Sequence, residues 1–123
     1  MAHVLTLREE PRYLHAIVTG TNSADAVSGY LSELLGECLA RRYSRLLIEE
    51  RLEGRRLDTL TVFKLVLEGI DRAQGRLRAI AYVDMNAGGD LMRFAEAVAV
   101  NRGLNVAVFS TLSDAQAWLA REA

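Results

Sequence analysis

Short apolar strand segments alternate with amphipathic helical segments along most of this 123-residue chain. Strands are predicted at 46–50, 77–83 and 105–109, and apolar residues recur at helical spacing after each of them. Strands that are apolar throughout are typical of a parallel sheet buried on both faces, which needs crossover helices to join and cover its strands. The alternation therefore predicts an α/β fold.

The amino-terminal residues predict an antiparallel hairpin. Val4, Leu5 and Leu7 form a weak first strand, residues 13–20 form a second, and the turn at 9–12 is too short for a parallel crossover. Together with the later elements, this gives a five-stranded mixed sheet with four helices, in the order β-β-α-β-α-β-α-β-α. The first strand is expected to be antiparallel and the rest parallel, in a single domain spanning 1–123.

Capping residues and apolar spacing locate the four helices. They are expected to start near Asn22, at Asp58 (running to about Gln74), before Leu91 and after Thr111. The apolar positions expected to face the sheet are Val27, Tyr30, Leu31, Leu34, Leu35, Cys38, Leu39, Leu60, Phe63, Val66, Leu67, Ile70, Leu91, Phe94, Ala95, Val98, Ala99, Ala115, Trp118 and Leu119.

Composition excludes several classes of protein. The net charge of −1 gives no global reason to expect a nucleic-acid partner. Cys38 is the only cysteine, so no intramolecular disulfide can form, and a reducing cytoplasm is the expected location. No apolar run approaches the roughly 20 residues of a membrane-spanning helix, and acidic residues at 9 and 10 argue against a signal peptide.

Two segments carry a family resemblance. Residues 94–119 contain a helix, a turn at Gly103, a strand and a closing helix with Trp118-Leu119, while 46–65 contain a strand leading into Leu57-Asp58-Thr59. The first resembles the carboxyl end of small bacterial SpoIIAA-like proteins, and the second is similar in spacing to the Asp-Ser-Ser-Gly helix start of STAS domains. The resemblance implies a SpoIIAA-like (STAS) fold and a non-catalytic regulatory module. For SEC14-type members it implies instead a pocket or membrane-facing groove, between helices, for a small molecule or lipid.

The STAS resemblance singles out Asp58 and Thr59 as phosphoacceptor candidates. In anti-anti-sigma members a serine at this helix start is phosphorylated, which breaks binding to a partner kinase; here Leu60 and Thr61 replace the Ser-Gly. A phosphate at a helix start would meet free N–H groups and a favourable dipole. Ordinary capping of the helix by Asp58 explains the same residues without a switch.

Polar residues near the carboxyl ends of the strands suggest a ligand site, because open α/β sheets bind ligands at that edge. The loop at 84–90 could surround an anion or gate a pocket between the second and third helices, although a flexible turn is the simpler interpretation. The arginine-rich loop at 51–56 could hold a phosphate or an acidic lipid head group, although acidic neighbours offset its charge. The pocket candidates are Glu49, Arg55, Arg56, Asp84, Asn86, Gly88 and Gly89. Apolar residues beside the inward stripes are Leu57, Val62, Leu65, Met85, Met92 and Val100.

The sequence contains no recognisable catalytic set. No Ser, His and Asp triad can be assembled, and His3 and His15 have no neighbours that suggest a metal site. An enzyme is therefore the least favoured class, and neither a cofactor nor a metal is expected. A regulatory module that binds a signalling protein is placed first, and a binder of a lipid or small metabolite second. Peripheral membrane contact and a homodimer through the opening hairpin stay open.

Overall fold

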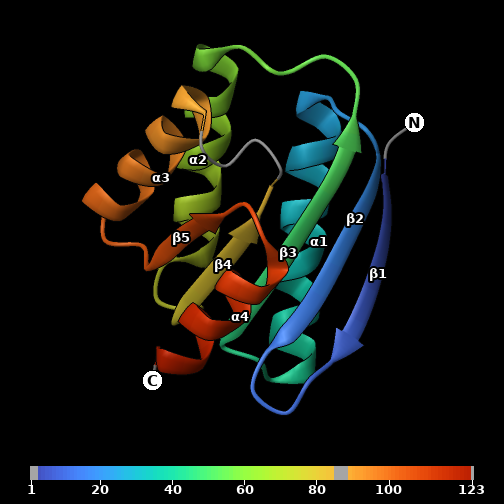
Figure 1. Cartoon of the computed structure of the whole chain (residues 1–123), viewed down its shortest axis with the longest axis vertical. Coiled ribbons are helices and arrows are strands. Elements are labelled where there is room, and N and C mark those ends of the chain that lie inside the picture. The colour runs from blue at the N-terminus through green and yellow to red at the C-terminus, as the bar shows by residue number, and fades with distance from the viewer. Residues whose placement is uncertain (1–2, 85–88, 123) are drawn as a thin grey trace.

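Over the residues described by the computed structural model, 3–84 and 89–122, five strands form one mixed sheet with four helices (Figure 1). The strands are β1 (His3–Glu9), β2 (Leu14–Thr21), β3 (Arg45–Glu53), β4 (Ala79–Val83) and β5 (Val106–Phe109). The helices are α1 (Ala24–Arg41), α2 (Thr59–Ala73), α3 (Asp90–Asn101) and α4 (Leu112–Arg121).

The strands lie side by side in chain order, with β1 antiparallel to β2 and all other neighbours parallel. The predicted fold class and element order are confirmed. Each crossover moves one strand in the same direction, so right-handed connections place α1, α2 and α3 on one face of the sheet. Helix α4 packs against β3, β4 and β5 on the other face (Figure 1).

Alternate residues of the strands feed two separate cores. Leu14, Ala16 and Ile48 belong to the core under α1 to α3, whereas Leu47 and Ala81 belong to the core under α4. Helix α4 is shorter than the layer of three helices and packs mainly against β3, β4 and β5, so the same face of the sheet carries polar residues such as His15 on β2.

The helix starts follow capping chemistry. The Ser23 hydroxyl accepts a hydrogen bond from the backbone N–H of Ala26 at 3.0 Å, so Ser23 caps α1 and the prediction of a cap at Asn22 is wrong. The Asn22 amide instead donates to the backbone carbonyl of Arg55 at 3.1 Å. Asp58 caps α2 and Thr111 caps α4, as predicted. These bonds fix where each of these helices begins.

Two of the strand boundaries that differ from the sequence prediction have a clear structural cause. Strand β3 continues to Glu53, beyond the predicted end at 50, because β2 supplies parallel partners as far as Thr21. Strand β4 begins at Ala79 instead of residue 77, because the Leu77 N–H still bonds to the carbonyl of Ala73 at the end of α2. Pairing with β2 sets the first boundary, and the last turn of α2 sets the second.

Three residues predicted to face the sheet are exposed, so those assignments are wrong. Leu39, Leu60 and Phe94 keep 50%, 62% and 37% of their surface accessible. Apolar spacing identifies a stripe that is wider than the actual contact surface. Phe94 packs along the seam between α2 and α3, with its ring centroid 6.2 Å from that of Phe63.

Candidate ligand-binding cavity

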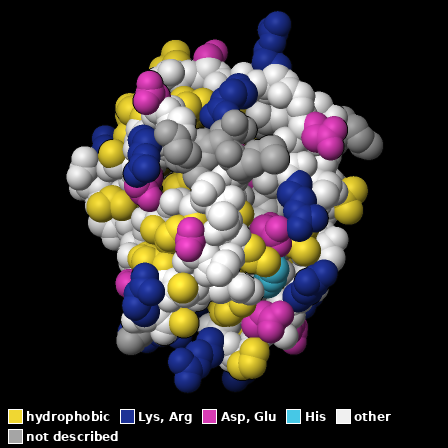
Figure 2. All heavy atoms as spheres, in the orientation of Figure 1, with side chains coloured by type: hydrophobic (Ala, Val, Ile, Leu, Met, Phe, Trp, Pro, Cys, Tyr) yellow, Lys and Arg dark blue, Asp and Glu magenta, His cyan; other side chains and the backbone are white. Residues whose placement is uncertain are grey.

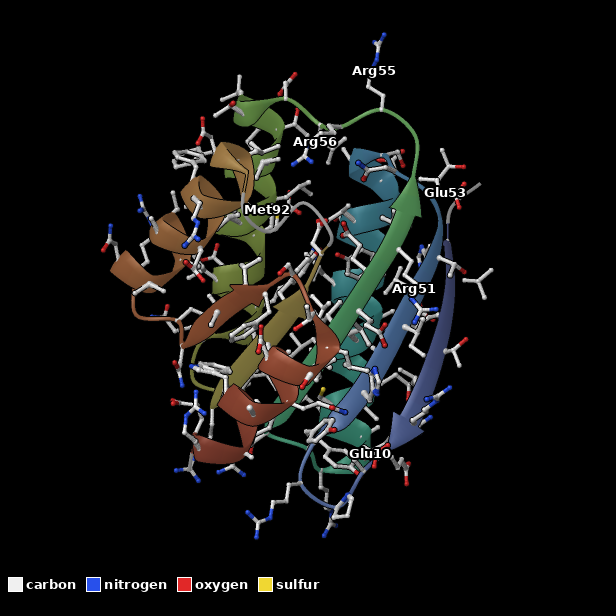
Figure 3. The ribbon with its side chains drawn as sticks, in the orientation of Figure 1. Glu10, Arg51, Glu53, Arg55, Arg56 and Met92 are labelled. Atoms are coloured by element: carbon white, nitrogen blue, oxygen red, sulfur yellow. The ribbon has the colours of Figure 1, made fainter. Side chains whose placement is uncertain are left out.

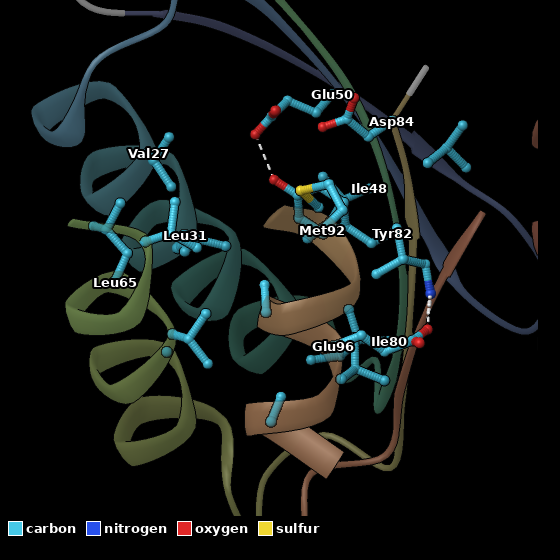
Figure 4. Close-up of a pocket in the computed structure, with 18 of the residues that line it drawn as sticks. Val27, Leu31, Ile48, Glu50, Leu65, Ile80, Tyr82, Asp84, Met92 and Glu96 are labelled. Atoms are coloured by element: carbon cyan, nitrogen blue, oxygen red, sulfur yellow. Dashed lines mark hydrogen bonds between the residues drawn. The ribbon is translucent and has the colours of Figure 1, made fainter. Parts of the chain in front are cut away.

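A cavity of about 580 Å³ lies between the sheet and the layer formed by α1, α2 and α3 (Figure 4). Ligand sites in proteins usually occupy roughly 300–1,000 Å³ and are mostly apolar. The apolar walls include Val27, Leu31, Ile48, Leu65, Ile70, Ile80, Leu91, Met92 and Val106. This face of the sheet therefore holds space of ligand size inside an apolar shell.

Small residues on α2 and α3 leave this space open. Gly69 and Ala73 of α2, together with Ala95 and Ala99 of α3, line the cavity. A Cβ atom added to Gly69 would meet no heavy atom within 4 Å. Because these positions carry almost no side chain, the two helices do not fill the region above β3 and β4.

One end of the cavity is polar. The hydroxyls of Tyr30 and Tyr82 both hydrogen-bond to Oε2 of Glu50 and to each other. Figure 4 shows the carboxyl groups of Glu50 and Asp84 at this same end. Tyr30, on α1, is fully buried and hydrogen-bonds to Glu50 from the side away from the cavity. An apolar chamber therefore ends in the carboxyls of Glu50 and Asp84 and the phenol of Tyr82, with the Tyr30 phenol buried behind them.

The phenol hydroxyls of Tyr30 and Tyr82 both donate to Oε2 of Glu50. Burial raises the pKa of Glu50 above its ordinary value, and nearby Asp84 adds to this, while the two tyrosine hydroxyls oppose it. Burial also raises the pKa of both tyrosines well above 10, so the phenols stay neutral. The polar end thus holds its protons tightly.

The residues predicted from the sequence as a pocket occupy different places. Glu49, Arg56 and Asp84 line the cavity. Arg55 is exposed and points away from the protein body (Figure 3). Gly89 is the N-cap residue of α3, without a side-chain cap. Asn86 and Gly88 lie outside the described residues.

Of the apolar residues that the sequence places beside the helical stripes, some line the cavity and others do not. Leu57, Val62, Leu65 and Met92 line the cavity. Val100 is half exposed on α3, and Met85 lies outside the described residues. Four of these positions therefore help to build the apolar wall.

Glu49 borders the cavity along β3, but the alternation of side chains on a strand turns its carboxylate to the opposite face of the sheet. There its Oε1 lies 2.8 Å from His15 Nε2, and its Oε2 accepts from Arg51 at 2.6 Å. Burial raises the pKa of Glu49, but the bonds from Arg51 and His15 outweigh it and hold the pKa below its ordinary value. Both His15 and Glu49 are buried, at 3% and 8% exposure, so this network is a satisfied part of the α4 face.

Sequence reasoning missed both polar networks. It assigned Tyr30 to the core and gave Tyr82 no role, and only the β3–β4 register brings Tyr82 opposite Ile48, two residues from Glu50. One signal was present in the sequence. Glu49 and Glu50 continue an apolar strand without a break, and buried carboxylates need partners.

Asp58 and Thr59 lie at the exposed start of α2. Oδ1 of Asp58 accepts from the backbone N–H of Thr61 at 2.8 Å. This bond holds the pKa of Asp58 below its ordinary value. Thr59 is the first residue of the helix and is exposed, next to the exposed side chain of Leu60.

Comparison with protein-family models finds no match, and comparison with curated protein sequences also finds none. Within residues 3–84 and 89–122, no group of three or more His, Cys, Asp or Glu side chains could hold a metal ion. None of the helices in the described part is both long and apolar enough to cross a bilayer. Acidic and basic side chains are interspersed on the face shown in Figure 2.

Proposed function

We propose that this protein binds a small apolar molecule in the cavity between its sheet and α1 to α3. The observation that carries the proposal is the 580 Å³ chamber, whose walls are apolar and whose far end presents convergent polar groups. A well-formed apolar pocket with a few converging polar groups is the usual form of a ligand site. In the proposed role the protein is a binding module, not an enzyme.

The proposal includes a relationship to the SpoIIAA-like superfamily, on its STAS/SEC14 side. The element order and the single antiparallel strand at the edge of the sheet support it, as they are those that the resemblance implies. A cytoplasmic location is part of the same proposal, supported by one buried, unpaired cysteine. Among the alternatives named from sequence, the small-molecule binder has the most direct structural support.

Regulation through a protein partner is the second candidate. The observation that favours it is the exposure of Thr59, where a kinase could reach the hydroxyl, beside the 62% exposed Leu60. Mass spectrometry of protein purified from its own host tests this candidate. An added phosphate mapped to Thr59 would support it, and an unmodified chain under all growth conditions would contradict it.

Methyl NMR tests the cavity directly, with decan-1-ol as the probe. We expect the methyl signals of Ile48 and Leu65 to shift on titration, because both side chains line the cavity. Signals of Leu47 and Leu119 should stay in place, since they belong to the core under α4. Equal shifts in both groups, or none in either, would contradict the proposal.

A pair of glycine variants gives the matched control. Gly69→Leu puts a side chain into the cavity from α2, and we expect it to abolish the decanol-induced shifts. Gly36→Leu makes the same change on α1, where an added Cβ also meets nothing within 4 Å and the position is exposed. Binding in the Gly36→Leu variant should match that of the unmodified protein. Unchanged binding in the Gly69→Leu variant would place the probe elsewhere.

A further inference from the structure

The polar end of the cavity restricts the chemistry of the ligand, and this inference rests on the binding function proposed above. Glu50 lies on the face of β3 that carries Ile48, so its side chain points into the α1 to α3 layer. Its partners are the hydroxyls of Tyr30 and Tyr82, with Asp84 close enough to disfavour its charge. The ligand head group must therefore face the carboxyls of Glu50 and Asp84 and the phenol of Tyr82.

The described residues supply no cation to this carboxyl. The ion pairs formed within 3–84 and 89–122 do not include Glu50. Three arginines line the cavity: Arg51 bonds to Glu49, Arg72 lies 4.0 Å from Glu68, and Arg56 forms no ion pair with Glu50. A carboxyl in an apolar chamber without a counterion is unstable when charged, so the site favours a positively charged occupant.

We propose that the ligand is an amphiphilic amine, with an apolar body against α2 and α3 and a protonated amino group at Glu50. The ammonium donates charge-assisted hydrogen bonds to the Glu50 carboxylate, and the Tyr82 oxygen offers a further acceptor. An ammonium that enters beside the Glu50 carboxylate pairs with it directly, and a neutral amine that enters beside the protonated carboxyl takes its proton. A ligand with a carboxylate head would instead add negative charge beside Glu50 and Asp84.

Three probes of equal chain length test this assignment on the full protein. Decan-1-amine, decan-1-ol and decanoate share the same apolar tail and differ in the charge of the head group. We expect the amine to bind about tenfold more tightly than the alcohol, the factor typical of one charge-assisted hydrogen bond, and decanoate to bind most weakly. Equal affinities of amine and alcohol would overturn the amine assignment and leave the cavity function intact. Absence of binding by all three would overturn both.

The variant Glu50→Gln keeps the shape of the side chain and removes its charge. Its affinity for decan-1-amine should fall about tenfold or more, while its affinity for decan-1-ol should change little. Glu9→Gln is the matched control, because it makes the same charge change on an exposed residue of β1 that does not line the cavity. An equal loss of amine binding in both variants would mean that overall charge, not Glu50, selects the amine. The comparison of the three probes on the unmodified protein does not depend on how well the variant folds.

Discussion

Replacing Gly69 by alanine should stabilise the protein, and the reason is the empty space beside α2. A glycine inside a helix costs about 1 kcal/mol relative to alanine. At Gly69 the added methyl meets nothing within 4 Å and enters an apolar cavity, which adds up to about 0.8 kcal/mol of burial. We therefore expect a gain of roughly 1–2 kcal/mol in the free energy of unfolding.

Gly36→Ala is the reference for this prediction. Gly36 also lies inside a helix with open space around an added Cβ, but it is exposed, so only the helix-propensity gain of about 1 kcal/mol applies. Urea denaturation followed by far-UV circular dichroism measures both gains, and each kcal/mol should raise the melting temperature by about 3–6 °C. The reasoning would be refuted if Gly36→Ala were stabilising and Gly69→Ala destabilising, because α2 would then have no room at position 69.

Three further predictions follow from the buried polar groups. The folded-state pKa of Glu50 is raised, so its contribution to stability should be full below about pH 4.3 and lost as the pH rises through the folded-state pKa. Urea titrations from pH 4 to 8 should show that this loss of stability is smaller in Glu50→Gln, and an equal loss in both proteins would contradict the prediction. The pKa of Glu49 is lowered, so its contribution to stability should be full above about pH 4.3 and lost in acid. Glu49→Gln should lower the free energy of unfolding by about 1–3 kcal/mol at pH 7 and weaken the dependence of stability on pH in acid. A Glu49→Gln variant as stable as the unmodified protein would contradict the network with His15 and Arg51. Burial raises the pKa of Cys38 to about 11, so iodoacetamide at pH 8 should label it only after unfolding, and rapid labelling of the native protein would show that α1 opens.

Much of the fold could be predicted from local sequence, because strand and helix periods differ and the turn at 9–12 is too short for a crossover. Cap chemistry was readable where one residue could serve, as at Asp58 and Thr111, and was misread where Asn22 and Ser23 competed. Exposure at Leu60 was not predictable, since spacing reports a stripe and not the width of its contact surface.

The cavity could be predicted only in part. The expected pocket between the second and third helices was placed from loop and strand-end residues, and Glu49, Arg56 and Asp84 do line the space. The cavity exists because positions such as Gly69 carry no side chain. How much space such a position leaves depends on how closely α2 and α3 approach the sheet. The Tyr30, Tyr82 and Glu50 group combines three elements, and only the packed fold brings those elements together.

The most direct test of the central claim is a crystal structure of the protein with decan-1-amine. The cavity account predicts density for the decyl chain between the sheet and helices α2 and α3, with the nitrogen about 3 Å from a carboxyl oxygen of Glu50. A cavity filled by inward movement of α3, with the amine absent or bound only on the surface, would contradict it.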